Sequence, residues 1–396
     1  MHRFIIFLYL FISTASCTSD EPLKQEYIGF LKANDSINIP FNFTLKDSLF
    51  NISNSKEKVS LLINQTNSDS LMLTSFIFED VIVYKNYNDS LKGFYYNKSL
   101  SRKIPFSARL GNERFQIFDP QNSNDFSGNW HMVFNPLGDN RFDSEMMIDQ
   151  NNKNIGGTVR TETGDYGFMQ GISDGKRLSM SNFNGYRAYM IDGQIKNDTI
   201  NGYMYRGNYD AIPFIAYKDA NFNLSDPYEL TKMKQGYDDF VFNFENINGE
   251  FISNTDKKFE DKIVLIQLMG TWCPNCLDES RYLSGLVENL DDVMLVSIAF
   301  EYAKEKKQAL NNLRKLKSRL NIEYDLLLAQ YGSSSKINAA EKLISLDTVI
   351  SYPTLIIVDK DKRVRRIHTG FNGPATGNKF EYFKKDFEEY LYSLRR

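Results

Sequence analysis

Cysteine and histidine are both scarce in this chain, with three of each in 396 residues. A structural zinc site usually takes four cysteine or histidine ligands, and small scaffolds held together by disulfides are dense in cysteine. The three histidines stand far apart, at positions 2, 131 and 368, and only two of the cysteines lie close together. We therefore expect no metal ion and no bound cofactor.

Basic tracts and long apolar runs are also missing. The net charge is −3 and the isoelectric point is near 5.8, with lysine and arginine spread along the chain. This distribution argues against nucleic acid as a partner. After residue 17, no segment reaches the roughly 20 apolar residues that a membrane-spanning helix needs. The length is sufficient for two or three domains that each bury a core.

Residues 1–16 have the pattern of a secretory signal peptide, with Arg3 before an apolar run and small residues before Cys17. The sequence at 14–17, Thr-Ala-Ser-Cys, resembles a bacterial lipobox in which threonine replaces the usual leucine. The resemblance implies cleavage before Cys17 and lipid attachment to it, with residues 17–24 as a tether. The alternative is an ordinary signal with an incidental cysteine. We expect a lipid-anchored protein of the cell envelope, in the periplasm or on the outer-membrane surface.

Residues 25–220 are predicted to form a mainly antiparallel all-β region. Short apolar runs alternate with Asn, Asp, Ser and Gly clusters, and turn signals recur about every ten residues in the second half. This rhythm is typical of a sandwich or a barrel, and a polar stretch at 120–128 divides it into two units. Several Asp-Ser or Asp-Thr triplets resemble bacterial O-glycosylation acceptors and serve equally well as turn residues. Residues 221–238 are predicted to be a linker.

From residue 239 the sequence pattern changes from short strands to alternating strands and helices, which predicts an α/β domain at 239–396. The stretch 262–270 is almost continuously apolar, as expected of a strand that is covered on both faces. Apolar residues at helical spacing follow it, then a second buried strand at 293–300 and a helical stretch at 302–320. A hairpin at 354–368 and a final helix complete the domain.

The sequence Trp272-Cys273-Pro274-Asn275-Cys276 stands between the strand at 262–270 and the helix that follows. A cysteine at a helix N-terminus forms its nucleophilic thiolate more readily, and a second cysteine one turn later can resolve a mixed disulfide. Pro274 suits the first helical turn because its missing N–H costs no bond there. A disulfide this short would be a poor staple, and a zinc site lacks ligands. We therefore predict a redox-active pair, with Trp272 covering one side of it.

These motifs resemble the TlpA/ResA-like thiol–disulfide oxidoreductases of the thioredoxin superfamily, in the form of Bacteroidetes-type lipoproteins. The resemblance covers the whole C-terminal domain, from the strand at 262–268 and the dithiol to Ser351-Tyr352-Pro353-Thr354 and the segment 370–374. It implies a thioredoxin-like fold, in which a cis peptide bond before Pro353 places the loop beside the two cysteines. The backbone of Tyr352 would then pair with an extended substrate. The alternative is a trans proline that only begins a strand.

Three residues depart from the pattern of the family or leave a role open. Gln267 occupies a place where thioredoxins often have a buried acid, and an amide cannot act as a base. Glu279 either faces the dithiol and takes over proton transfer or is a solvated residue of the first helical turn. Asn275 differs from the residues common at this position in relatives. Because the residues between the two cysteines tune the reduction potential of the pair, the direction of electron flow stays open. His368 is interpreted as a strand residue without a catalytic role.

The predicted activity is that of an extracytoplasmic, membrane-anchored protein-disulfide oxidoreductase that acts mainly as a reductase. Its partners would be protein thiols and disulfides, with re-reduction, by resemblance, from a membrane donor of the DsbD/CcdA type. A narrower version prepares apocytochrome c for haem attachment. The competing interpretation is a surface binding module in which the β region binds a partner and the dithiol is only modulatory.

Overall fold

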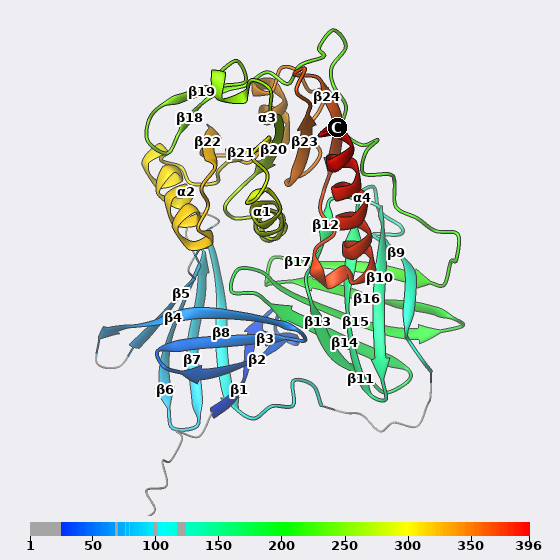
Figure 1. The fold of residues 1–396 in the computed structure, drawn as a ribbon. Coiled ribbons are helices and arrows are strands. Elements are labelled where there is room, and N and C mark those ends of the chain that lie inside the picture. The colour runs from blue at the N-terminus through cyan, green and yellow to red at the C-terminus, as the bar shows by residue number, and fades with distance from the viewer. Residues whose placement is uncertain (1–24, 68–69, 76, 79, 98–100, 117–123) are drawn as a thin grey trace, which may run out of the picture.

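A computed structural model of the chain describes residues 25–67, 70–75, 77–78, 80–97, 101–116 and 124–396. The predicted signal peptide, Cys17 and the tether lie outside these residues. The chain forms three sheets that lie side by side (Figure 1). Within the described residues, no helix combines the length and the apolar character required to cross a membrane.

The first sheet is a closed antiparallel barrel in which each strand pairs with the next and β1 pairs with β8. Its interior is packed with aromatic rings such as Phe41, Phe43 and Phe106, because inward positions alternate with outward ones along each strand. The strands are β1 (Gln25–Lys32), β2 (Asn38–Lys46), β3 (Leu49–Asn54), β4 (Glu57–Asn67), β5 (Ser70–Ser75), β6 (Asp80–Tyr87), β7 (Ser90–Asn97) and β8 (Arg102–Leu110).

The second sheet has nine strands in the order β10-β9-β17-β16-β15-β14-β13-β11-β12, and an additional pairing links the first strand, β10, to the last but one, β11. It has a core of its own, which includes Trp130, Met146 and Phe214. The strands are β9 (Gly128–Phe134), β10 (Phe142–Asn151), β11 (Asn154–Thr161), β12 (Gly164–Asp165), β13 (Met169–Ser173), β14 (Arg177–Phe183), β15 (Ala188–Lys196), β16 (Thr199–Arg206) and β17 (Asp210–Tyr217).

Buried polar contacts join the barrel to the second sheet. The Asn54 side chain bonds both backbone groups of Phe183, and the guanidinium of Arg114 donates to the carbonyl oxygens of Ser181 and Ser53. The ring of Phe183 packs on Phe41 in the barrel core. These contacts satisfy groups that would otherwise be costly to bury, and they hold the two sheets as one scaffold. We call residues 25–217 the β region.

The C-terminal domain contains a seven-stranded sheet in the order β19-β18-β22-β21-β20-β23-β24. Strand β20, in the interior of the sheet, is parallel to β21 and antiparallel to β23. The strands are β18 (Asn243–Asn246), β19 (Phe251–Ser253), β20 (Ile263–Met269), β21 (Val293–Phe300), β22 (Asp325–Gln330), β23 (Thr354–Val358) and β24 (Val364–Thr369). The helices are α1 (Pro274–Val287), α2 (Lys306–Leu320), α3 (Lys336–Lys342) and α4 (Asn378–Leu394), with short 3₁₀ turns η1 (Lys257–Phe259) and η2 (Pro374–Thr376).

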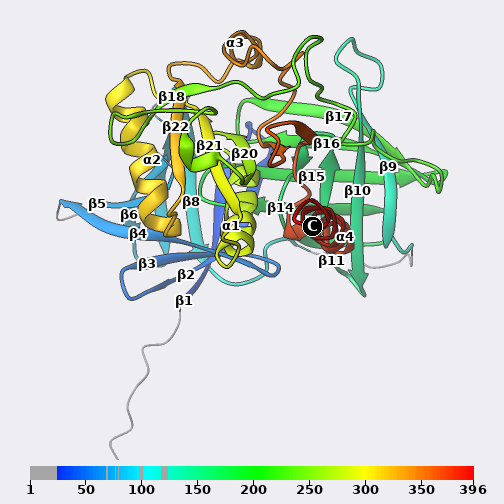
Figure 2. The ribbon, with the colours of Figure 1, turned by 45° about the horizontal axis from the view of Figure 1, so that its top comes forward.

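The predicted fold class is confirmed, with an α/β C-terminal domain after a mainly antiparallel all-β region that takes the barrel form. All seven residues of β20 are buried, which explains its continuous apolar character. The structure adds the strands β18, β19 and β22 and the helix α3 to the predicted elements. The C-terminal domain lies across both sheets of the β region, and the first turn of α1 faces the junction of these two sheets (Figures 1 and 2).

Candidate active site

The dithiol lies where β20 ends and α1 begins. Cys273 is the N-cap of α1, and its Sγ accepts a hydrogen bond from the backbone N–H of Cys276 at 3.3 Å. Pro274 occupies the first helical position, as its lack of an N–H allows. Both cysteines are free thiols, and only Cys273 has any exposed surface, 6% against 0% for Cys276. The geometry therefore distinguishes an accessible sulfur from a sheltered one.

A proline loop lies directly against the accessible sulfur. The peptide bond between Tyr352 and Pro353 is cis, as the sequence analysis favoured, and the Tyr352 carbonyl oxygen accepts from Cys273 Sγ at 3.3 Å. The ring of Tyr352 stacks on Phe300 and meets Trp272 edge to face, while the Trp272 Nε1–H donates to the Phe300 carbonyl. The loop, the tryptophan and the dithiol thus form one packed unit.

Behind the sheltered sulfur lies a buried polar cluster. Gln267 Nε2 donates to the Cys276 carbonyl oxygen at 3.1 Å and to Glu279 Oε2 at 2.9 Å. The other amide atom, Gln267 Oε1, accepts from the hydroxyls of Ser280 and Ser297. Gln267 therefore holds the carboxyl group of Glu279 beside the second cysteine.

Of the two interpretations of Glu279, the solvated one is wrong. Its side chain is fully buried, because the first turn of α1 packs onto the sheet, and burial raises its pKa to about 8. Burial, assisted by the neighbouring Cys273 and the Glu279 charge, also raises the pKa of the Cys276 thiol well above its ordinary value. Glu279 Oε1 has no hydrogen-bond partner among the described atoms, so in its ionised form the carboxyl group has an oxygen available to accept a proton.

Other residues of interest have structural positions. His368 is buried on β24, as predicted, with Nδ1 at 3.0 Å from the Gly370 carbonyl oxygen, and burial lowers its pKa to about 4. Sequence reasoning missed Glu301, whose carboxylate accepts from both the N–H and the hydroxyl of Thr271 and thereby orders the turn before the dithiol. Within the described residues, no cluster of three or more His, Cys, Asp or Glu side chains has the geometry to hold a metal ion.

The β region supplies part of the wall of this site. The Ser351 hydroxyl, beside the proline loop, donates to the Thr163 carbonyl at 3.1 Å, and the Gly373 N–H donates to Asp165 at 2.7 Å. Gly164, with φ +129°, lies so close that a Cβ there would stand 2.0 Å from the Asn275 amide nitrogen. Sequence reasoning did not foresee these contacts, which join segments about 110 to 210 residues apart.

A central buried strand followed by a dithiol at a helix N-terminus, opposite a cis-proline loop, defines a thioredoxin-like domain. Comparison with known proteins agrees: residues 237–367 match the AhpC/TSA family. No curated protein has a sequence similar enough to match this chain.

Three solved structures illustrate what the chain is similar to. A thiol-disulfide oxidoreductase from Bacteroides fragilis is 16% identical, with a TM-score of 0.27 over 36% of this chain and 96% of that one. A thiol:disulfide interchange protein from Chlorobium tepidum is 16% identical, with a TM-score of 0.28 over 37% and 94%. A DsbF homologue from Corynebacterium diphtheriae is 19% identical, with a TM-score of 0.30 over 41% and 98%.

Proposed function

We propose that this protein is a thiol–disulfide oxidoreductase of the TlpA/ResA-like type that reduces disulfides of protein substrates. One observation carries the proposal. An accessible Cys273 sulfur lies between a helix N-terminus and the carbonyl of a residue before a cis proline, with a sheltered Cys276 one helical turn behind it. A nucleophile and a resolving thiol need this inequality of exposure.

The reaction follows from the positions of the two sulfurs. The Cys273 thiolate attacks one sulfur of the substrate disulfide, which forms a mixed disulfide and releases one substrate thiol. Cys276 then loses its proton and attacks Cys273 Sγ, which closes the Cys273–Cys276 disulfide and releases the second thiol. Two electrons pass from the dithiol to the substrate, and an external dithiol must restore them.

Glu279 is the proposed proton acceptor for the second step. The Cys276 thiol is reluctant to ionise because it is buried, and the Glu279 carboxyl that interacts with it has an oxygen without a hydrogen-bond partner among the described atoms. A base is the most effective proton carrier when its pKa lies near the pH at which the enzyme works. The Glu279 pKa of about 8 is close to neutral pH. Gln267 positions the carboxylate and carries no proton itself.

The proposed cellular location of the activity is inferred from the N-terminal sequence. A lipid on Cys17 would hold the enzyme at the cell envelope, in the periplasm or at the outer-membrane surface, and a membrane donor of the DsbD/CcdA type would re-reduce it. A disulfide of apocytochrome c, whose reduction gives the thiols needed for haem attachment, is one substrate compatible with this setting. A redox titration of the pair against glutathione tests the reductase direction, which requires a potential more reducing than that of the substrate disulfides.

The assignment of roles is tested by trapping. The Cys276→Ser variant of the full chain should accumulate mixed disulfides on Cys273, because the resolving thiol is gone. The matched control is the Cys273→Ser, Cys276→Ser double variant, which should trap nothing. If the single variant traps no substrate while the wild type still exchanges disulfides, the roles given to the two cysteines are wrong.

A further inference from the structure

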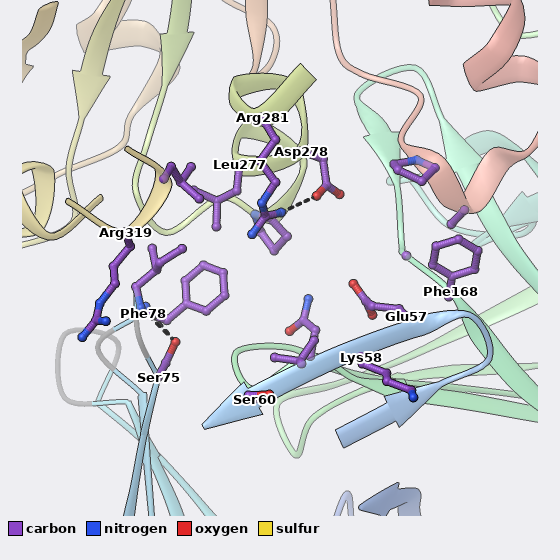
Figure 3. A pocket seen from close by; sticks show the side chains of 18 of the residues that line it. Glu57, Lys58, Ser60, Ser75, Phe78, Phe168, Leu277, Asp278, Arg281 and Arg319 are labelled. Atoms are coloured by element: carbon purple, nitrogen blue, oxygen red, sulfur yellow. Dashed lines mark hydrogen bonds and ion pairs between the residues drawn. The ribbon is translucent and has the colours of Figure 1, made fainter. Parts of the chain in front are cut away.

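Cys273 lies on the wall of a cavity between the C-terminal domain and the β region. The cavity has a volume of about 420 Å³, and its lining combines Trp272, Cys273 and Tyr352 with residues from the loops of the second sheet. A second cavity of about 680 Å³ adjoins it and shares Glu57, Asp165 and Asp278 among its lining residues. Figure 3 shows this second cavity, with Asp278 and Arg281 on α1 facing Glu57 across it.

The contacts of the β region limit what can reach the sulfur. Thr163 and Gly164 lie over the proline loop and Asn275, so the face beside the dithiol is covered from one side. Cys273 itself is only 6% exposed. We call this cavity between the C-terminal domain and the β region the seam. A substrate must therefore present its disulfide on a narrow part of its structure that enters the seam, as a small molecule or an extended segment does.

Some of the cations that line the cavity of Cys273 have no carboxylate partner. Arg206 is paired with Asp210, but no carboxylate of the described residues forms an ion pair with Arg187 or Lys336. Arg187 precedes β15, and among the described residues its guanidinium donates to the Tyr186 hydroxyl at 3.3 Å and lies over the ring of the same tyrosine. Lys336 begins α3 at the exposed rim. Both residues line the same cavity as Cys273.

The carboxyl groups around the seam are engaged elsewhere. Asp165 accepts from the backbone N–H groups of Gly167 and Gly373, and Asp278 pairs with Arg281 at 2.7 Å. Glu57 accepts from the Asn54 amide, and burial raises its pKa to about 7, so part of the population is neutral at that pH. Arg187 and Lys336 are therefore the cationic groups of this lining that form no ion pair with a carboxylate of the described residues.

We propose that the seam is the substrate site and that it selects disulfides with a carboxylate close to the sulfur. Arg187 and Lys336 bind this carboxylate. The inference rests on the proposed function and names its substrate class. A guanidinium without a carboxylate partner in a partly buried site gains a charge-assisted hydrogen bond when an anion enters. The β region would then contribute specificity, while the C-terminal domain carries out the exchange described above.

The test compares three small symmetrical disulfides that differ in charge. Reduced full-length protein is mixed with 3,3′-dithiodipropionate, 2-hydroxyethyl disulfide or cystamine, which carry negative, neutral and positive ends, and the rate of thiol release is measured. The wild type should react fastest with the anion, by about tenfold over the neutral compound. Arg187→Ala should remove most of this preference, and Arg187→Lys should restore part of it.

Two controls separate binding from a general change at the sulfur. Arg141→Ala removes one exposed arginine of the β region away from the seam and should leave the preference unchanged. The pH profile of alkylation by neutral iodoacetamide reports the ionisation of Cys273. If Arg187→Ala only shifted this profile and slowed all three disulfides equally, the inference would be overturned.

A second series identifies the source of the carboxylate. Disulfide-linked pentapeptide dimers are compared in which the residue before cysteine is aspartate or asparagine. A preference for aspartate assigns the site to acidic peptide segments, and a preference confined to the small disulfides assigns it to free small molecules. Equal rates in both series overturn the inference and leave the proposed function intact, whereas no exchange with any disulfide overturns the proposed function itself.

Discussion

The β region and the C-terminal domain bury their strands in different ways. Strand β3 alternates buried and half-buried residues, whereas every residue of β20 is buried. A strand with one wet face tolerates polar residues anywhere on that face, but a strand covered on both sides must satisfy each polar group internally. Gln267 is the polar residue of β20, and its amide makes four hydrogen bonds. The C-terminal domain thus places its chemistry in the core, and the β region places its contribution in loops.

The largest expected effect separates the two regions by activity. Replacement of the nucleophile in Cys273→Ser should reduce disulfide exchange by at least about 10³-fold, because no other described thiol is exposed. Tyr203→Ala, at an exposed tyrosine of β16, is the matched change in the β region and should leave exchange unaltered. Equal losses in the two variants would show that the division of labour is wrong.

The next effect concerns stability, and the chain has one tryptophan in each part to report it. Phe183→Ala removes a fully buried ring that contacts Phe41 and Tyr95 and should cost about 3–5 kcal/mol of unfolding free energy. Denaturant unfolding followed in a Trp272→Phe background reports the β region through Trp130, and a Trp130→Phe background reports the other domain. The loss should be larger in the Trp130 signal; an identical shift in both signals would mean that the molecule unfolds as one unit.

The buried carboxyl of the C-terminal domain makes a pH-dependent prediction. The Glu279 pKa is 4.5 when exposed and about 8 in the fold, so the native state binds the extra proton between these values. Its contribution to stability therefore declines as pH rises from 4.5 to about 8 and is constant above that. Glu279→Gln, which keeps the shape, should be stabilised relative to the wild type by an amount that grows to the order of a few kcal/mol at pH 8.

The measurement is the free energy of unfolding of both proteins at pH 5, 6.5 and 8. A difference that does not change with pH would contradict the raised pKa of Glu279. The same variant should also slow the release of the second substrate thiol, by about 10²-fold or more, if the carboxylate takes the proton from Cys276.

The smallest effect probes the seam between the two regions. Gly164→Ala adds a Cβ that meets Asn275 at a positive φ, and we expect a cost of about 1–3 kcal/mol together with faster alkylation of Cys273 by iodoacetamide as the seam loosens. Gly236→Ala is the matched control, because Gly236 also has positive φ but nothing lies within 4 Å of the added atom. Equal alkylation rates in the two variants would show that the loop does not shield the sulfur.

Much of the C-terminal domain was predictable because its signals are local. The apolar run of β20 and the spacing of the cysteines depend on residues a few positions apart, and a strand and a helix N-terminus follow from them, whereas the cis bond before Pro353 was expected only from the family resemblance. In the β region, the turn rhythm predicted antiparallel strands but left sandwich and barrel open. That choice depends on the pairing of β1 with β8, which lie far apart in the sequence.

The sequence by itself determined the class of each region and predicted the redox pair and the roles of its two sulfurs, because periodicity and motif spacing depend on short stretches of chain. Only the tertiary structure decided that Glu279 is buried beside Cys276 and that Thr163, Gly164 and Arg187 stand at the mouth of the site. Whether a polar side chain ends in water or in a cleft depends on which distant segment packs against it. No local pattern encodes that packing.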